Sequence, residues 1–167
     1  MPQEKTAQFF GEVKVSFVYL RQTGMASNQF AVWIEDDTGT FIKTLYATRF
    51  TAKGGWQNRP ESIPTWVEAA QPDSLSNGQI DSITGATPQA GDLTYLWDCK
   101  DSNGNLVPAG EYRYCVEGSV RWKSRVLYTG TITVGGPAQQ STAEREAYGD
   151  DEEEWNMITN VAAEYYP

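Results

Sequence analysis

The chain has 167 residues, 40% of them hydrophobic and 13% aromatic, so a single domain of this size can bury a substantial core. Its 13 Lys and Arg against 22 Asp and Glu give a net charge of −9, which disfavours nucleic acids and anionic membranes as partners. Histidine is absent, which excludes serine–histidine triads, cysteine–histidine dyads and imidazole metal sites, and the two cysteines alone cannot complete a tetrahedral zinc site.

The N-terminus and the hydropathy of the chain bear on its location. Residues 1–5, Met-Pro-Gln-Glu-Lys, lack the apolar stretch of a secretory signal peptide. The chain is therefore either a cytosolic protein or a mature exported form to which a start codon was added. No apolar run reaches the length needed to cross a bilayer, so no direct membrane span is expected.

The first part of the chain predicts three β-strands. Apolar and polar residues alternate over 12–19 and again over 30–34, which is the period of a half-buried strand. The sequence Asp36-Asp37-Thr38-Gly39 is a turn signal, so the second strand and Phe41–Ala47 are expected to form a hairpin.

A long excursion, residues 51–91, separates these strands from the next ones. Plain loops of this length are uncommon in compact domains and are often functional. One short helix is expected inside it, because apolar residues between positions 63 and 70 recur at helical spacing and Ser62 is a candidate N-cap.

The second part of the chain is again rich in strand signals. Five short strands are expected between Gly-, Pro- and Asn-rich turns: Leu93–Cys99, Glu111–Glu117, Val120–Lys123, Arg125–Thr129 and Ile132–Val134. Residues 137–154 are small, polar and finally acidic, and are predicted to be a solvated linker. Alternation from Met157 to Tyr165 then predicts a last strand that returns to the sheet. Many short strands with frequent turns predict an all-β sandwich, with residues 1–167 as one domain.

One segment of the excursion carries a specific chemical hypothesis, and it reads Asp-x-x-Thr-Gly-Ala-Thr. Gly85 and Ala86 add almost no bulk, so the chain can enter the cleft of another enzyme, and Gly85 can adopt backbone angles closed to other residues. Asp81 and Thr84 favour local side-chain-to-backbone hydrogen bonds and hence a turn. Thr87 supplies a hydroxyl that the base or metal of a partner would have to activate.

This segment resembles the acceptor motif on which FAD-dependent FMN transferases place FMN, as a phosphoester on the last threonine. The resemblance implies covalent FMN on Thr87, with Asp81, Thr84, Gly85 and Ala86 as the remaining motif residues. Flavinylated subunits usually continue with small polar residues, whereas a proline follows here. The alternative is a turn of small residues that leads into the next strand.

Two further groups of residues are candidate ligand sites. Arg49, Lys53 and Arg59 at the start of the excursion could hold a flavin phosphate or stack on its ring, and the alternative is a solvated basic loop. The oxygen-rich loop at 98–105 has some features of a calcium site, but it lacks the terminal glutamate and enough carboxylates, so an Asn-Gly turn is favoured.

The two cysteines lie on predicted strands that flank one loop. In a hairpin centred near Asn105, Cys99 would face Tyr112 rather than Cys115, so free thiols are expected rather than a disulfide. A disulfide would need the two strands to lie in different sheets or to be offset.

The segment Leu96–Tyr112 resembles the Ig-like module of flagellar hook-capping proteins, which repeats Trp-Asp, Asp-x-x-Gly and Pro-x-Gly-x-Tyr arrangements. The resemblance implies an Ig-like sandwich in which Trp97 and Tyr112 anchor the core from neighbouring strands. It informs the fold more than the function.

A broader resemblance covers most of the chain. Ser27–Asp36, Lys43–Phe50, the Thr-Gly-Ala-Thr-Pro segment and Glu117-Gly118 are similar to a bacterial family of predicted periplasmic proteins of unknown function. Its members look associated with flavin transferases and with PepSY-type membrane proteins. The resemblance implies an extracytoplasmic protein and favours the mature exported form over the cytosolic one.

Together these observations predict an all-β, Ig-like sandwich with one elaborated insertion that contains a short helix. The expected function is that of an extracytoplasmic electron carrier with FMN on Thr87, attached by an FAD-dependent FMN transferase, with a PepSY-type membrane redox protein as a further partner. Such a protein would catalyse nothing by itself. The alternative is a non-catalytic Ig-like binding or structural module. An enzyme with its own acid–base residues ranks third, because no carboxylates are paired recognisably.

Overall fold

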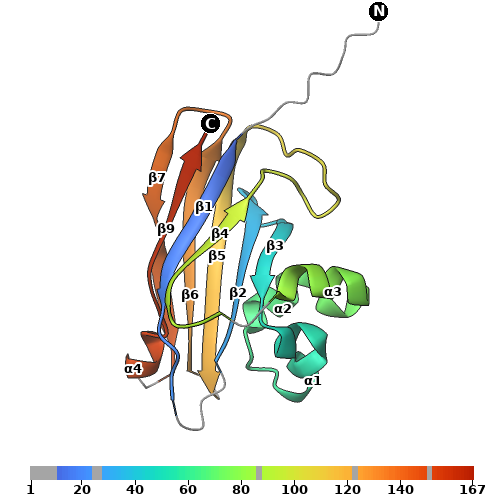
Figure 1. The fold of residues 1–167 in the computed structure, drawn as a ribbon, viewed down its shortest axis with the longest axis vertical. Helices are drawn as coiled ribbons and strands as arrows, with labels where there is room; N and C mark the ends of the chain where they lie inside the picture. Colours follow the sequence, from blue (N-terminus) through green and yellow to red (C-terminus); the bar gives the residue numbers. More distant parts are fainter. Residues whose placement is uncertain (1–10, 24–27, 86–87, 122–123, 150–151) are drawn as a thin grey trace, which may run out of the picture.

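Two antiparallel β-sheets pack face to face, and a layer of helices covers the outer face of one of them (Figure 1). The computed structural model describes residues 11–23, 28–85, 88–121, 124–149 and 152–167. Strands make up 49% of the chain and helices 22%, which lies below the helix content of an average mixed domain. The prediction of an all-β sandwich is therefore confirmed, while its Ig-like character stays a prediction.

The first sheet, sheet A, has the strand order β4–β1–β9–β7. Its strands are β1 (Glu12–Tyr19), β4 (Gly91–Trp97), β7 (Gln139–Thr142) and β9 (Ile158–Tyr166). The second sheet, sheet B, has the order β3–β2–β5–β6–β8. Its strands are β2 (Gln29–Asp36), β3 (Phe41–Ala47), β5 (Gly110–Arg121), β6 (Ser124–Val134) and β8 (Glu144–Tyr148).

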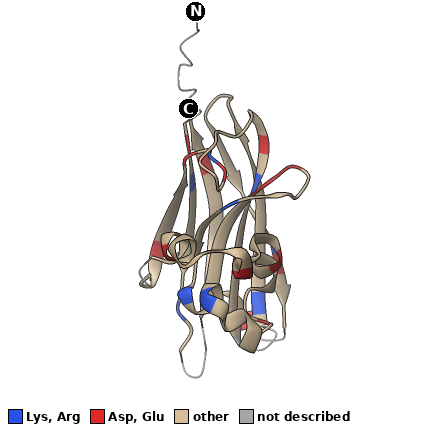
Figure 2. Cartoon of the chain, turned by 90° about the vertical axis from the view of Figure 1, so that its right-hand side faces the viewer, with Lys and Arg blue, Asp and Glu red and all other residues tan. Residues whose placement is uncertain are grey.

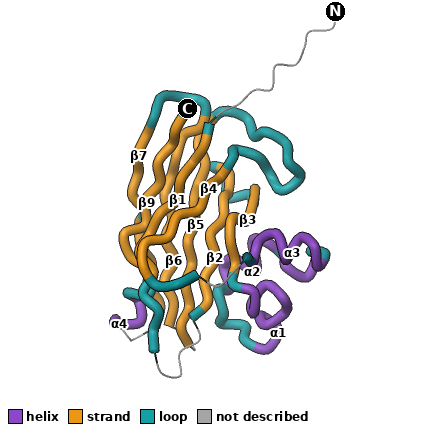
Figure 3. The backbone as a smooth tube through the Cα atoms, viewed as in Figure 1, coloured by secondary structure: helices purple, strands orange, loops and turns teal. Residues whose placement is uncertain are grey.

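The helices lie mainly in the insertion between β3 and β4. A π-type turn (Thr51–Gly55) runs into α1 (Trp56–Asn58), and α2 (Pro64–Ala70), a 3₁₀ turn (Pro72–Ser74) and α3 (Asn77–Thr84) follow. Helix α4 (Glu152–Trp155) lies apart from them, before β9 (Figure 3). The helix expected near residues 63–70 is confirmed as α2, but the insertion holds further helical segments that the sequence pattern did not predict.

The sandwich core fills the space between the two sheets. The alternation of β1 places Val13, Val15, Phe17 and Tyr19 inside, and each fully buried aliphatic or aromatic side chain of this kind contributes about 1.5–3 kcal/mol. Trp97 and Tyr112 are 0% and 5% exposed, and their rings meet edge to face at 5.2 Å. The expectation that both anchor the core is confirmed.

A second core lies between sheet B and the helices. The outer face of the sheet contributes Ala31, Trp33, Ala47 and Cys115, and the insertion contributes Ile63, Trp66, Ala70 and Ile80. Strand β2 is therefore covered on both faces, and its residues from Gln29 to Ile34 are all buried. This three-layer arrangement holds the insertion, including helix α3 where the motif begins, against the sheet.

The linker predicted at 137–154 is wrong, because these residues contain β7, β8 and α4. Strand β7 pairs with β9 at one edge of sheet A, and β8 pairs with β6 at one edge of sheet B. Their side chains are mostly exposed and polar, so no apolar alternation marks them in the sequence. Pairing with a neighbour, rather than local pattern, makes these edge segments strands.

Two predicted strand breaks are also wrong. Gly118 lies inside the continuous strand β5 and Gly130 inside β6, where the sequence pattern predicts turns. A Cβ at Gly130 would lie 2.2 Å from the ring of Tyr114, and one at Gly118 would lie 2.6 Å from Ile158. These glycines make room for large core side chains, and they do not turn the chain.

Replacing Gly130 by alanine is therefore expected to destabilise the fold by about 1–3 kcal/mol, because the new methyl group must displace Tyr114. The matched control is Gly78→Ala in α3, where an added Cβ meets nothing within 4 Å. That change should raise the free energy of unfolding by about 0.5–1 kcal/mol, since alanine favours helices over glycine. Urea unfolding of the two variants tests whether the free energy of unfolding changes in opposite directions. An unchanged free energy of unfolding in Gly130→Ala would contradict the close packing of Gly130 against Tyr114.

Both cysteines are free, as expected, but for a different reason than hairpin register. Strands β4 and β5 belong to different sheets, and Cys99 lies in the sandwich core whereas Cys115 lies in the outer core. Sheet B thus separates the two thiols. Burial raises the pKa of Cys99 to about 11 and raises the pKa of Cys115 further.

We expect neither thiol to react with a thiol reagent in the folded protein, because buried thiols with raised pKa values form little thiolate. Unfolding without a reductant should release two reactive thiols, and Cys99→Ser should release one. An unfolded wild-type chain with no reactive thiol would instead indicate a disulfide.

Candidate functional site

The Asp-x-x-Thr-Gly-Ala-Thr motif begins in the last turn of helix α3. The helix starts with a capping box, in which the backbone N–H of Gln79 donates to Ser76 Oγ at 3.2 Å and the backbone N–H of Ser76 donates to Gln79 Oε1 at 2.8 Å. Asp81 and Thr84 are therefore helical, and the turn predicted for them is wrong. The cap and the burial of Ile80 outweigh the turn preference of these residues.

Gly85 ends the helix in a conformation that only glycine adopts readily. Its φ of +39° and ψ of −163° lie outside the regions open to residues with a side chain. An added Cβ would meet nothing within 4 Å, so the backbone angles, not a lack of space, favour glycine here. The predicted special conformation of Gly85 is confirmed. Ala86 and Thr87 lie outside the described residues.

The buried hydroxyl of Thr84 is a second notable feature at the end of α3. Its side chain is 1% exposed, and its Oγ1 makes no hydrogen bond within the described part of the chain. An unpaired buried hydroxyl costs about 1–3 kcal/mol. The end of α3 therefore carries a buried hydroxyl that has no hydrogen-bond partner among the described residues.

A basic residue of the insertion, Arg49, forms an ion pair with the first residue of the motif, Asp81. Arg49 Nη1 lies 3.2 Å from Asp81 Oδ1, and both side chains are more than half exposed. Such a surface pair contributes only about 0–1 kcal/mol to the stability of the fold. Its importance here is that it places a guanidinium group beside the motif. Of the other candidates, Lys53 is exposed and Arg59 lies 3.9 Å from Glu61. Figure 2 shows basic and acidic residues close together on the helical layer.

A groove of about 110 Å³ runs between α3 and β3. Its apolar lining includes Phe41, Leu75 and Ile83, and its polar lining includes Lys43, Ser82 and Ser102. Ser82 and Ile83 are the two unspecified positions of the motif, between Asp81 and Thr84. The sequence pattern did not predict this groove, because its walls come from a strand, a helix and a loop that meet only in the fold.

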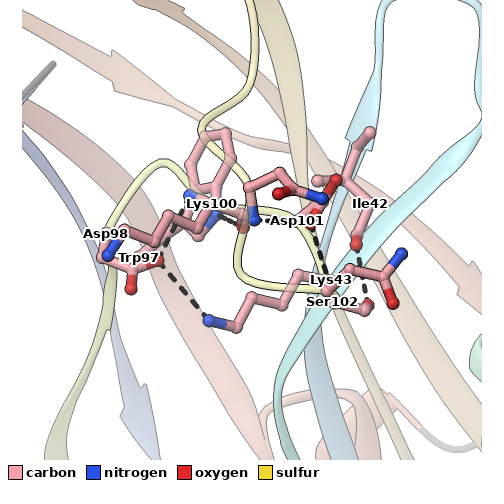
Figure 4. Close-up of polar contacts among 9 residues, drawn as sticks. Ile42, Lys43, Trp97, Asp98, Lys100, Asp101 and Ser102 are labelled. Atoms are coloured by element: carbon pink, nitrogen blue, oxygen red, sulfur yellow. Dashed lines mark hydrogen bonds and ion pairs between the residues drawn. The ribbon is translucent and has the colours of Figure 1, made fainter. Parts of the chain in front are cut away.

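The groove rim is held by contacts between β3 and the loop after β4 (Figure 4). Lys43 Nζ lies 3.4 Å from Asp98 Oδ1, and the backbone N–H and the hydroxyl of Ser102 both donate to the carbonyl oxygen of Ile42, at 3.1 and 2.9 Å. Asp101 Oδ1 accepts backbone hydrogen bonds from Asn103 and Asn105. The Asp101 carboxylate thus stabilises the turn predicted at Asn103-Gly104.

A buried carboxylate anchors the insertion to sheet B. Glu117 on β5 is fully buried and accepts hydrogen bonds from the backbone N–H groups of Thr65 at 3.3 Å and Trp66 at 2.9 Å, at the start of α2. Arg125 Nη1 donates to Glu117 Oε2 at 2.9 Å. Burial raises the pKa of Glu117, against the opposing effect of these hydrogen bonds, so the folded protein retains a proton here to higher pH than the unfolded chain does.

The residue before α2 is strained and held from the same strand. Ile63 has a φ of +37°, which is unfavourable for a β-branched residue, and its side chain is fully buried. Its backbone N–H donates to Ser119 Oγ at 3.2 Å. Glu117 and Ser119 thus fix the path of the chain into α2. Glu117 and Gly118 belong to the segments that carry the family resemblance, but no local pattern in the sequence predicts this structural role.

Comparison with models of protein families matches residues 11–151 to the DUF2271 family, described as predicted periplasmic proteins. No curated protein and no solved structure matched the chain. Within the described residues, no helix is both long and apolar enough to cross a membrane. Since the match covers most of the chain, the protein belongs to the DUF2271 family and is extracytoplasmic.

Proposed function

We propose that this protein is an extracytoplasmic electron carrier with FMN bound covalently to Thr87. The observation that carries the proposal is the end of α3, where the motif leaves the helix through an exposed Gly85 in a glycine-only conformation. A transferase must draw the acceptor segment into its own cleft, and the open space around Gly85 suits that approach.

The attachment reaction needs only a hydroxyl from this chain. The Thr87 oxygen attacks the phosphorus of FAD on its FMN side, a new P–O bond forms, and the bond between the two phosphates of FAD breaks. AMP leaves with the electron pair, and the hydroxyl proton passes to a base of the transferase. The chain contains no histidine, so activation of the hydroxyl is assigned to the FAD-dependent FMN transferase.

The residues around the motif fit a flavin phosphodiester. The exposed guanidinium of Arg49 lies beside the motif through its pair with Asp81, and it suits the single negative charge of the new ester. When bound, the flavin would supply reversible electron uptake, and the protein would tether and orient it.

The partners follow from this function and from the family resemblance. The transferase would load the protein, and a PepSY-type membrane redox protein would exchange electrons with it. The alternative function, a non-catalytic binding or structural module, would make the motif a helix end without a cofactor.

The test is expression with export in a host that carries an active FMN transferase. The exported protein should gain the mass of FMN less one water and should give a fluorescent band on a denaturing gel. The same protein made in a cytosol without the transferase is the control and should be bare. An exported wild-type protein of unchanged mass would overturn the proposal and favour the binding module.

A further inference from the structure

The groove between α3 and β3 has the composition of a small-molecule site. Its walls combine apolar side chains, among them Phe41, Leu75 and Ile83, with polar groups from β3, α3 and the loop after β4. Ligand sites typically combine apolar walls with a small number of placed polar groups. Lys43 is the one charged residue among the described residues that line the groove.

The groove is joined directly to the motif. Ser82 and Ile83 line it, and Thr87 follows Ile83 by four residues, which span at most about 14 Å of extended chain. A group tethered at Thr87 is therefore kept at high local concentration beside the groove. From this geometry we infer that the groove seats one edge of the isoalloxazine ring of the flavin carried on Thr87, an inference that rests on the proposed function.

The size of the groove determines how the ring is held. Its volume of about 110 Å³ lies below the roughly 300–1,000 Å³ of clefts that enclose a whole ligand. The groove therefore covers one edge of the ring and leaves the other open. An electron carrier needs such an open edge, because the flavin must come close to a partner protein.

The positive charge of Lys43 is expected to influence the midpoint potential of a flavin in the groove. A cation beside a flavin stabilises the extra negative charge that arrives on reduction, and this raises the midpoint potential. Asp98, 3.4 Å from Lys43 Nζ, opposes this effect in part. Lys43→Gln should therefore lower the midpoint potential of the bound flavin, and Asp98→Asn should raise it.

The experiment uses the flavin-loaded, exported protein, with flavin content measured after denaturation. The midpoint potential is measured for wild type, Lys43→Gln, Lys43→Arg and Asp98→Asn, with Lys14→Gln on β1 as the control for a distant charge. We expect a lower midpoint potential in Lys43→Gln and a higher one in Asp98→Asn. Lys43→Arg and the control Lys14→Gln should have midpoint potentials near that of wild type.

A second measurement reports the position of the ring. Iodide should quench the flavin of the intact protein severalfold less than the flavin of the peptide released by protease. Leu75→Asp places a charge in the groove wall and should remove this protection, whereas Leu96→Asp, at an exposed position on β4, should not. The inference alone is overturned if the flavin of the loaded protein is quenched by iodide as strongly as that of the released peptide. It is also overturned if Lys43→Gln leaves the midpoint potential unchanged. A protein that never loads overturns the proposed function and the inference with it.

Discussion

Thr87→Ala is expected to abolish covalent flavin completely and to leave the protein folded. The substitution removes the only atom of the motif that can form the phosphoester in the proposed position. Thr87→Ser keeps a hydroxyl and should retain flavin. In-gel fluorescence and intact mass of the exported variants measure both effects, and far-UV circular dichroism checks the fold. Flavin that persists in Thr87→Ala would place the attachment elsewhere.

Gly85→Val tests the same site through the backbone. Valine is poorly compatible with a φ of +39°, and forcing a side chain into such a region costs about 1–3 kcal/mol. The end of α3 should rearrange, so that loading falls while most of the fold remains. Gly78→Val, at an open position in the first turn of the same helix, is the matched control. Equal loading of the two variants would contradict a role for the Gly85 conformation.

Glu117→Ala is expected to be strongly destabilising, with a loss of about 3–5 kcal/mol in the free energy of unfolding. Two backbone N–H groups at the start of α2 lose their acceptor, and the Arg125 guanidinium loses its carboxylate partner at 2.9 Å, keeping Thr65 and the Tyr148 ring. No water can easily replace the carboxylate, because Glu117 is fully buried under the insertion. Urea unfolding measures the change.

The matched control is Glu111→Ala, at an exposed position on the same strand, which should change the free energy of unfolding by less than about 0.5 kcal/mol. Because Trp66 Nε1 donates to Thr44 Oγ1 at 3.0 Å beneath α2, detachment of the insertion should also shift tryptophan emission to the red. If Glu117→Ala has the same free energy of unfolding as wild type, the carboxylate does not anchor the insertion.

The sequence by itself determined the parts of the fold that carry a local signal. The alternation of β1 and β9, the β2–β3 hairpin with its Asp36 turn, and α2 all follow from period and turn chemistry. Trp97 and Tyr112 are buried as predicted, and Gly85 holds the conformation for which glycine was expected. For the strands, the hairpin and α2, the residues within a short window were sufficient, because propensity and pattern agree there. The burial of Trp97 and Tyr112 was implied by the resemblance to hook-capping proteins.

Only the tertiary structure decided the rest. Strands β7 and β8 form because sheet edges offer backbone partners, and the glycines of β5 and β6 make room for Tyr114 and Ile158 instead of turning the chain. The groove and the Glu117 anchor join residues that lie far apart in the sequence, such as Lys43 and Ile83, or Glu117 and Trp66. Such long-range pairs cannot be predicted from a single sequence, because the energy of a contact depends on which surfaces the fold brings together.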